Sequence, residues 1–303
     1  MERLENIPAI IWYYLSSIAL PFNLVIQQRW VIPQITIKDF YLPLLGESLV
    51  FFALFFGGIS LFKHVKTYFR LYMFFLAWFL LGLAMLLQIF PLDLTIADRW
   101  FYLPLVGFLG CLGILFKVFL SRFRGKVFGL LGVILILFFS LLTIARNANY
   151  SDEITLYIHD LQINEDAIME NDLGINYAKS GNMQVAFHYL QKSVQDDPYP
   201  GNLYNLALAY EQVGEIRKAK EYYVKAFNVS EAYFSINGIE RRKGNENLAI
   251  YETNSAIYER LGWVLLRLEE YQNAEKNSKL GLRYYPESDV LLQQLKIAKS
   301  KLK

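Results

Sequence analysis

The chain has 303 residues and a formal net charge of +2; 54% of its residues are hydrophobic and only 19% are charged. A soluble domain typically has about 25% charged residues, so this composition argues against a purely soluble protein. The small net charge, without a basic stripe or zinc-finger spacing, gives no support for a nucleic-acid partner.

The charged residues are distributed unevenly along the chain. Long uncharged stretches extend to about Ile144, whereas charged and amide side chains become frequent after Arg146. This contrast predicts a transmembrane domain over 1–149 and a water-exposed domain over 150–303. The first residues, MERLENIP, lack the basic start of a signal peptide, and no cleavage site stands out after the first apolar run.

Five apolar stretches approach or reach the length of a membrane span. A bilayer core about 30 Å thick requires about 20 apolar residues in a helix. The stretches are 8–26, 41–62, 71–91, 100–120 and 127–145. The first one is short and contains Pro21, which would kink a helix.

The loops between these stretches predict the orientation in the membrane. Loops 63–70 and 121–126 are short and basic, whereas loops 27–39 and 91–99 have fewer Lys and Arg residues. The positive-inside rule places the basic loops in the cytoplasm. With five spans, the N-terminus is then cytoplasmic, and the domain 150–303 is extracytoplasmic in a bacterial inner membrane or a membrane of the endoplasmic-reticulum type.

Two features of the apolar part have both a structural and a functional interpretation. Gly107, Gly110 and Gly113 are three residues apart on one predicted span. Such small residues allow helices to pack closely, and they form no nucleotide loop because no strand precedes them. Glu47 lies near the start of another span, either at head-group depth or as a costly and functional carboxylate inside the membrane.

The segment IADRWFYLPLVG at 96–107 precedes the fourth span. Trp100 and Tyr102 suit an interfacial aromatic belt, and Arg99 can reach lipid head groups. Alternatively, the Arg99 guanidinium can hold a phosphate while Asp98 orients it. The residue types leave both interpretations open.

The polar part contains three similar segments, 173–198, 206–230 and 261–286. Gly174 and Ala207 are 33 residues apart, close to the roughly 34-residue period of the tetratricopeptide repeat (TPR), which these segments resemble. The positions that carry this pattern are Gly174, Tyr177, Gly181, Ala186, Pro198, Ala207, Tyr210, Gly214, Ala219, Gly262, Ala274 and Pro286.

Each residue type in the pattern has a physical role in a helical hairpin. Small residues let the two helices touch, and the tyrosines fill the space between them. Gly181 and Gly214 allow a left-handed turn at a helix end, and prolines stop the second helix. The fold class is therefore all-α, with transmembrane helices followed by a TPR solenoid.

Three further segments complete the predicted repeat domain. Residues 151–163 form an amphipathic helix with Ser151 as its N-cap. Residues 231–256, with Gly244 and Ala249, form a degenerate repeat with a shortened second helix. Residues 289–303 form a helix that covers the last repeat.

The polar part has no recognisable catalytic or metal-binding motif: HExxH, GxSxG and cysteine pairs are absent from the sequence, whose one cysteine is Cys111. Asn205, on the inner face of a first helix, could bind an extended peptide from a protein partner. The other interpretation of Asn205 is a solvated residue in the groove.

The order of these motifs resembles the C-terminal part of the transmembrane, TPR-containing O-mannosyltransferase-like proteins, which are multispan GT-C-type glycosyltransferases. The resemblance covers about residues 10–230. Tyr150 departs from it, because the family often has tryptophan there. The matching residues are Asp98, Arg99, Tyr102, Leu103, Pro104, Arg146, Asp152 and Leu156.

The resemblance implies that Asp98, Arg99 and Tyr102 bind the lipid phosphate of a polyprenyl-phosphate sugar donor, and that the repeats are extracytoplasmic. Such enzymes have more spans and paired acidic residues in the first outer loop, where this chain has only Asp39. No catalytic base can therefore be named.

Two functions remain open at this stage. The first is a C-terminal half, or a catalytically incomplete form, of a protein involved in protein glycosylation. The second is a non-enzymatic, membrane-anchored TPR scaffold for protein–protein interactions in the cell envelope. A transporter is less favoured because the spans contain few charges.

Overall fold

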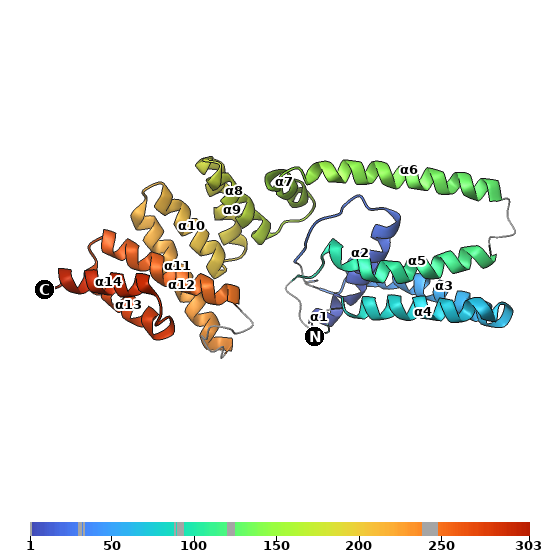
Figure 1. The fold of residues 1–303 in the computed structure, drawn as a ribbon, viewed down its shortest axis with the longest axis horizontal. Helices are drawn as coiled ribbons and strands as arrows, with labels where there is room; N and C mark the ends of the chain where they lie inside the picture. The colour runs from blue at the N-terminus through green and yellow to red at the C-terminus, as the bar shows by residue number, and fades with distance from the viewer. Residues whose placement is uncertain are drawn as a thin grey trace. The chain divides into compact units, whose positions relative to one another are not determined.

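The structure is a computed structural model that describes residues 2–29, 32, 34–87, 89, 94–119, 125–237 and 248–303. It divides into two compact units, Met1–Asn164 and Glu165–Lys303. Helices make up both units (Figure 1), which confirms the all-α prediction.

The first unit contains the apolar helices and one short polar helix. The helices are α1 (Glu2–Glu5), α2 (Ile7–Ala19), α3 (Leu42–His64), α4 (Lys66–Ala84), α5 (Tyr102–Phe119), α6 (Gly125–Asn149) and α7 (Glu153–Ile163). A π-helical turn, η1 (Ile37–Tyr41), leads into α3, and a 3-10 turn, η2 (Asp98–Phe101), leads into α5. An isolated antiparallel bridge joins Gln28 to Ile96.

Four helices among the described residues are long and apolar enough to cross a membrane: Ile37–His64, Lys66–Ala84, Asp98–Phe119 and Gly129–Asn149. The first of the five predicted spans is shorter than expected, because α2 has 13 residues and ends before Pro21. A helix of this length covers about 20 Å, less than a bilayer core of about 30 Å. Figure 1 shows α2 running crosswise to α4 and α5.

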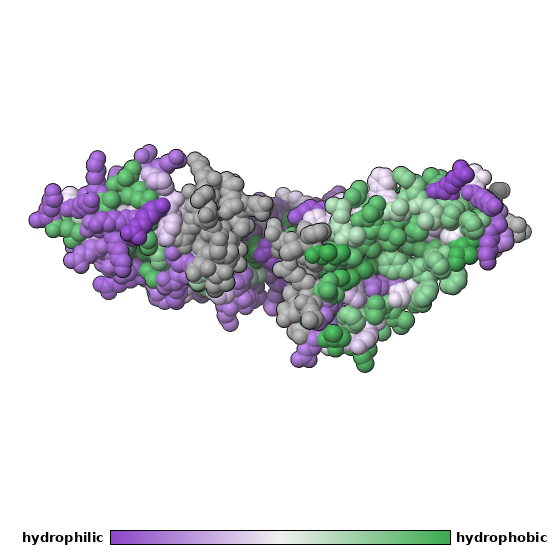
Figure 2. Space-filling view, turned by 90° about the horizontal axis from the view of Figure 1, so that it is seen from below, coloured by the Kyte–Doolittle hydropathy of each residue, from purple (hydrophilic) through white to green (hydrophobic). Residues whose placement is uncertain are grey.

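The surfaces of the two units differ in polarity. Hydrophobic side chains cover much of the unit that contains α3, α4 and α5, whereas hydrophilic side chains dominate the unit with the C-terminal helices (Figure 2). This difference agrees with the two solvents expected from the sequence.

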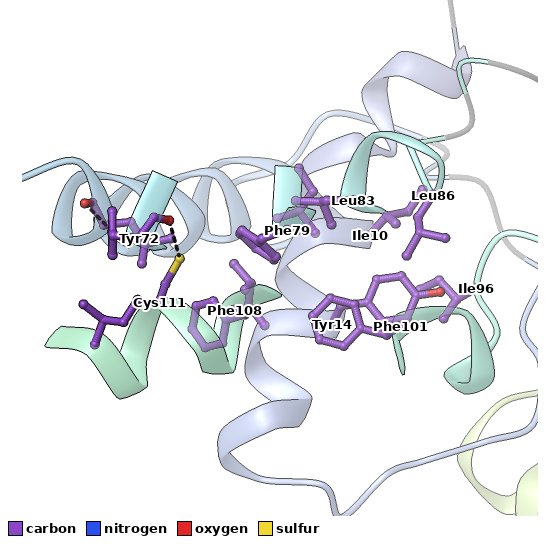
Figure 3. Packing of buried hydrophobic residues seen from close by; sticks show 14 of the residues in the cluster. Ile10, Tyr14, Tyr72, Phe79, Leu83, Leu86, Ile96, Phe101, Phe108 and Cys111 are labelled. Carbon is purple, nitrogen blue, oxygen red and sulfur yellow. Dashed lines mark hydrogen bonds between the residues drawn. The ribbon is translucent and has the colours of Figure 1, made fainter. Parts of the chain in front are cut away.

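The core of the first unit is formed by α2, α3, α4, α5 and the turn before α5, and Figure 3 shows part of it. The ring of Tyr14 stacks on Phe101 with centroids 4.9 Å apart and planes 8° apart. The rings of Phe79 and Phe108 lie 5.4 Å apart. The first contact holds α2 against the turn before α5, and the second holds α4 against α5.

The glycines of α5 have different roles. A Cβ on Gly107 would lie 2.5 Å from the backbone nitrogen of Phe79, and one on Gly110 would overlap the Phe75 ring. A Cβ on Gly113 would meet nothing within 4 Å. Close helix packing is thus confirmed for Gly107 and Gly110, whereas Gly113 has no such contact.

The polar helix α7 begins one residue later than expected. Asp152, and not Ser151, is its N-cap, because the Asp152 side chain accepts a hydrogen bond from the Thr155 N–H at 2.9 Å. The helix belongs to the first compact unit. The structural boundary therefore follows α7, whereas the change in composition precedes it.

The second unit consists of helical hairpins followed by a final helix. Its helices are α8 (Ala167–Lys179), α9 (Met183–Asp196), α10 (Pro200–Gln212), α11 (Ile216–Asn237), α12 (Leu248–Arg267), α13 (Tyr271–Tyr284) and α14 (Asp289–Lys301). The pairs α8–α9, α10–α11 and α12–α13 are the three repeats, and α14 packs against α12 and α13 as expected for a covering helix.

The repeat positions have the predicted environments. A Cβ on Gly174 would lie 2.7 Å from Leu190 Cγ and 3.1 Å from the Leu190 backbone nitrogen, so this site requires a small residue, and a Cβ on Gly262 would overlap the amide at the end of the Gln294 side chain. The four alanines are fully buried: Ala186, Ala207, Ala219 and Ala274. Pro198 and Pro286 follow the ends of α9 and α13.

The turns and tyrosines of the repeats also agree with the pattern. Gly181 and Gly214 have φ values of +84° and +82°. Tyr177 stacks on Tyr189 of the same hairpin with ring centroids 5.9 Å apart. Tyr210 stacks on Tyr222 of its own hairpin at 5.4 Å and also contacts Phe187 of the preceding one at 4.7 Å.

The prediction of a degenerate repeat over 231–256 is wrong. Helix α11 continues to Asn237, and α12 is continuous from Leu248 through Gly262 to Arg267. Residues 248–256 therefore belong to the beginning of the next first helix and residues 231–237 to the end of the preceding second helix, whereas residues 238–247 lie outside the described part of the chain. Gly244 lies outside the described residues.

Candidate functional site

The predicted lipid-phosphate residues lie at the junction of α2 and η2. Tyr13 donates a hydrogen bond from its hydroxyl to Asp98 Oδ1 at 2.8 Å. The Tyr14 hydroxyl bonds to the backbone of Ala97, donating to its carbonyl at 3.1 Å and accepting from its N–H at 3.2 Å. The crosswise helix α2 thus fixes the backbone and the carboxylate at the start of α5.

Asp98 and Tyr102 line the same small pocket, of about 150 Å³, together with Tyr13, Tyr14 and Phe101. Arg99 does not line this pocket, and Asp98 is oriented toward Tyr13 rather than toward Arg99. Within the described part of the chain, Arg99 has no carboxylate partner. The structure therefore brings two of the three predicted residues together.

A buried polar cluster near the start of the second domain was not expected from the sequence. Asp160 on α7 is fully buried, and it accepts hydrogen bonds from Arg146 Nη1 at 2.9 Å and from the Ile26 N–H at 2.8 Å. The Nδ1 atom of His159 lies 2.8 Å from the same Asp160 oxygen that Arg146 contacts. These contacts connect α6, α7 and the segment after α2.

Glu47 is buried in α3, and only 6% of the residue is exposed. Its Oε2 atom has no hydrogen-bond partner among the described residues. Burial of a carboxyl group without a partner is costly, and this burial by the protein itself leaves both interpretations of Glu47 open, because it does not fix the depth of the residue in a membrane. Among the described residues, no contact places another titratable side chain beside Glu47.

A row of polar residues crosses the first helices of the three repeats. Asp172, Asn205 and Arg260 occupy equivalent positions, each two residues before the small residue of its repeat. Equivalent residues of stacked repeats lie side by side, and first helices line the concave surface of such solenoids. Asn205 Nδ2 donates to Asn171 Oδ1 at 3.0 Å, which links α10 to α8 along this row.

An ionic group lies further along the same helices. Glu211 on α10 is 3.6 Å from Arg267 and 3.9 Å from Arg260, both on α12. The hydroxyl of Tyr223 donates to Glu211 Oε2 at 2.9 Å, and burial together with this carboxylate raises the pKa of Tyr223. The charges of this surface are mixed, so it suits a polar partner of mixed charge better than a purely acidic or basic one.

The described residues contain no group of three or more His, Cys, Asp or Glu side chains placed to hold a metal ion.

Comparisons with known proteins agree with the repeat geometry. A sequence profile of the tetratricopeptide repeat matches residues 201–233, which cover α10 and most of α11. No curated protein matches the chain.

Three solved structures are similar to parts of the chain. The second TPR domain of human RPAP3, solved by NMR in complex with an HSP70 peptide, has 19% identity and a TM-score of 0.35 over 44% of this chain and 94% of that chain. A structure described as MamA MSR-1 C2 has 22% identity and a TM-score of 0.37 over 53% of this chain and 81% of the other. The Cut9–Hcn1 heterotetramer of APC/C has 15% identity and a TM-score of 0.28. The match covers 81% of this chain and 45% of that chain.

The likenesses to solved structures are too distant to carry an argument about function. The profile match and the three hairpins, with their small, tyrosine and left-handed positions, together establish the repeats. The chain is an all-helical protein that carries tetratricopeptide repeats.

Proposed function

We propose that this chain is a membrane-anchored TPR protein that binds a protein or peptide partner outside the cytoplasm. The observation that carries the proposal is the polar row of Asp172, Asn205 and Arg260 across three successive first helices. TPR solenoids use this concave side for extended binding surfaces. Asn205 donates through its amide nitrogen to Asn171, so its Oδ1 atom is available to accept a peptide N–H.

The proposed location rests on the basic loops. Because the four candidate spans alternate in direction along the chain, loops 63–70 and 121–126 are expected on the same side of the membrane, and the positive-inside rule assigns that side to the cytoplasm. Helix α6 then crosses outward, so the repeats are extracytoplasmic whether or not α2 spans the membrane. With four spans, the N-terminus is on the side of the repeats, in contrast to the cytoplasmic N-terminus expected from five.

Site-specific photocrosslinking in intact cells tests partner binding. A photoreactive residue at Asn205 should give a crosslinked partner, whereas one at the exposed Lys276, on the second helix α13, should not. Arg260→Glu should reduce the Asn205 crosslink, and Lys276→Glu should leave it unchanged. Equal crosslinking from Asn205 and Lys276 would contradict the proposed surface.

A second candidate function is participation in glycosyl transfer from a polyprenyl-phosphate sugar donor. The observation that favours it is the shared pocket of Asp98 and Tyr102, two residues that match the resemblance to the O-mannosyltransferase-like proteins. Arg99, the predicted phosphate ligand, lies outside the pocket lining. If the site binds a lipid phosphate through Arg99, Arg99→Ala should abolish binding of a polyprenyl phosphate in detergent; unchanged binding would remove this candidate.

A further inference from the structure

A larger pocket, of about 520 Å³, shares Tyr13 of α2 with the small pocket that Asp98 lines. It is formed by α2, the segment that follows α2, η1, the start of α3 and the residue after α7. Its polar and aromatic lining consists of Trp12, Tyr13, Ser16, Gln28, Lys38, Asp39 and Asn164. The volume falls within the range of about 300–1,000 Å³ that is typical of small-ligand sites.

Three polar groups of this pocket have unused bonding capacity. Lys38 makes no ion pair with the residues that the structure describes. Asp39 uses Oδ2 to accept from the Thr36 hydroxyl at 2.7 Å, and none of the described residues donates a hydrogen bond to its Oδ1. The Nδ2 atom of Asn164 is buried without an acceptor. The pocket therefore presents a cation, a carboxylate oxygen and an amide donor.

The position of these groups favours a lipid over a soluble ligand. Lys38 and Asp39 stand at the start of the apolar helix Ile37–His64, where a membrane span meets the head-group region. Trp12 and Tyr13 are of the residue types enriched at that depth. Trp12 packs against Gly46 of α3 and is still 37% exposed.

The opposite charges of Lys38 and Asp39 decide which head group fits. A purely anionic head group would be repelled by Asp39, and a purely cationic one would be repelled by Lys38. A head group with a phosphate and a primary ammonium can place the phosphate against Lys38 and Asn164 and the ammonium against Asp39. Both contacts are charge-assisted hydrogen bonds, and the ammonium can also lie near the Trp12 ring.

We propose that this pocket binds the phosphoethanolamine head group of an aminophospholipid. The proposal goes beyond partner binding by the repeats and does not depend on it. Because Asn164 directly follows α7, which Asp160 attaches to α6, the head group would contact the connection between the apolar helices and the repeats.

Binding of short-chain lipids to the full chain in a non-ionic detergent tests the proposal by calorimetry. Dihexanoyl phosphatidylethanolamine should bind at least about tenfold tighter than the phosphatidylglycerol and phosphatidylcholine analogues, as expected for one charge-assisted hydrogen bond. The glycerol head group has no cation, and the trimethylammonium of choline has no N–H to donate.

Variants identify the groups responsible. Asp39→Asn should remove the preference for ethanolamine over choline, and Lys38→Gln should weaken binding of all three lipids. Lys66→Gln, at an exposed lysine at the start of α4, should change neither. Unchanged unfolding temperatures establish that the variants are folded. If Asp39→Asn does not fold, the proposal is still tested by the head-group preference of the unsubstituted chain and by the lipid affinities of Lys38→Gln. Equal affinity for the glycerol lipid, or an ethanolamine preference that survives Asp39→Asn, would overturn the proposal.

Discussion

Arg146, near the end of the last apolar helix, donates from Nη1 to the fully buried carboxylate of Asp160 on α7 at 2.9 Å. The other Asp160 oxygen accepts from the Ile26 N–H at 2.8 Å. One carboxylate therefore satisfies a partly buried cation and a backbone donor from different parts of the first unit. This contact fixes the point at which the chain leaves the apolar helices.

Asp160→Ala should destabilise the first unit by about 3–5 kcal/mol, because it leaves the Arg146 cation buried without its partner. The matched control is Glu153→Gln, which removes an exposed carboxylate from the same helix and should have an effect within about 0.5 kcal/mol. Thermal unfolding of the full chain in detergent, followed by circular dichroism, measures both. Equal effects of the two substitutions would contradict a structural role for the buried pair.

Glu269 has a φ of 61° at the turn position where the first two repeats have glycine. This backbone conformation costs an L-residue roughly 1–2 kcal/mol, and glycine avoids that cost. Because glycine also loses more backbone entropy on folding, Glu269→Gly should stabilise the repeats by only about 0.5–1 kcal/mol. Gly214→Glu should destabilise them by a similar amount. Urea unfolding gives both values, and a destabilised Glu269→Gly variant would argue against the turn.

Lys220 on α11 donates to both carboxylate oxygens of Glu270, at 2.6 Å and 2.7 Å, and connects the second and third repeats. This hydrogen bond, followed by one from Asn273, holds the pKa of Glu270 below its usual value. Because the pKa of Glu270 is lower in the folded state, the interaction with Lys220 stabilises the fold at pH values above the unfolded-state pKa of about 4.3. This stabilisation is lost as the pH falls through the folded-state pKa.

Lys220→Met should therefore reduce stability by at most about 1 kcal/mol at pH 7, because the pair is partly exposed. The difference from the unsubstituted chain should shrink as the pH falls from 5 to 3. Lys276→Met, at an exposed lysine on α13, serves as the control and should show no such convergence. Denaturant midpoints across this pH range are the measurement, and a difference that grows on acidification would have the wrong sign.

Gly107 and Gly113 provide a matched pair on α5. Gly107→Val should destabilise the contact of α4 with α5 by about 1–3 kcal/mol, because the new side chain would overlap the backbone of Phe79. Gly113→Val meets no neighbour and should be tolerated. Thermal unfolding in detergent distinguishes the two, and equal stability of both variants would show that the helices are not packed as described.

The repeat units could be predicted from the sequence because their positions depend on local sterics. Gly174, Ala207 and Gly262 are small where two helices touch, and Gly181 and Gly214 are glycine where φ is positive. Such requirements recur at a fixed spacing, so a single sequence reveals them. Glu269 departs from the pattern, and only the structure shows that it adopts the same turn.

The parts that could not be predicted depend on contacts between distant segments. Apolar composition alone does not distinguish a spanning helix from the short, crosswise α2, whose direction is set by Tyr13 and Tyr14 against the turn before α5. The bond from Ile26 to Asp160 joins residues 134 positions apart, so no local pattern indicates it. The same holds for the pocket shared by Lys38 and Asn164.

Labelling of single cysteines tests the central claim, that the repeats lie outside the cytoplasm. In a chain whose buried Cys111 is replaced by alanine, Lys276→Cys and Lys66→Cys should be exposed to a membrane-impermeant maleimide on opposite sides of the membrane. In intact cells or sealed right-side-out vesicles, Lys276→Cys should react, and Lys66→Cys should react only after the membrane is permeabilised. Labelling of Lys66→Cys before permeabilisation, with Lys276→Cys protected, would contradict it.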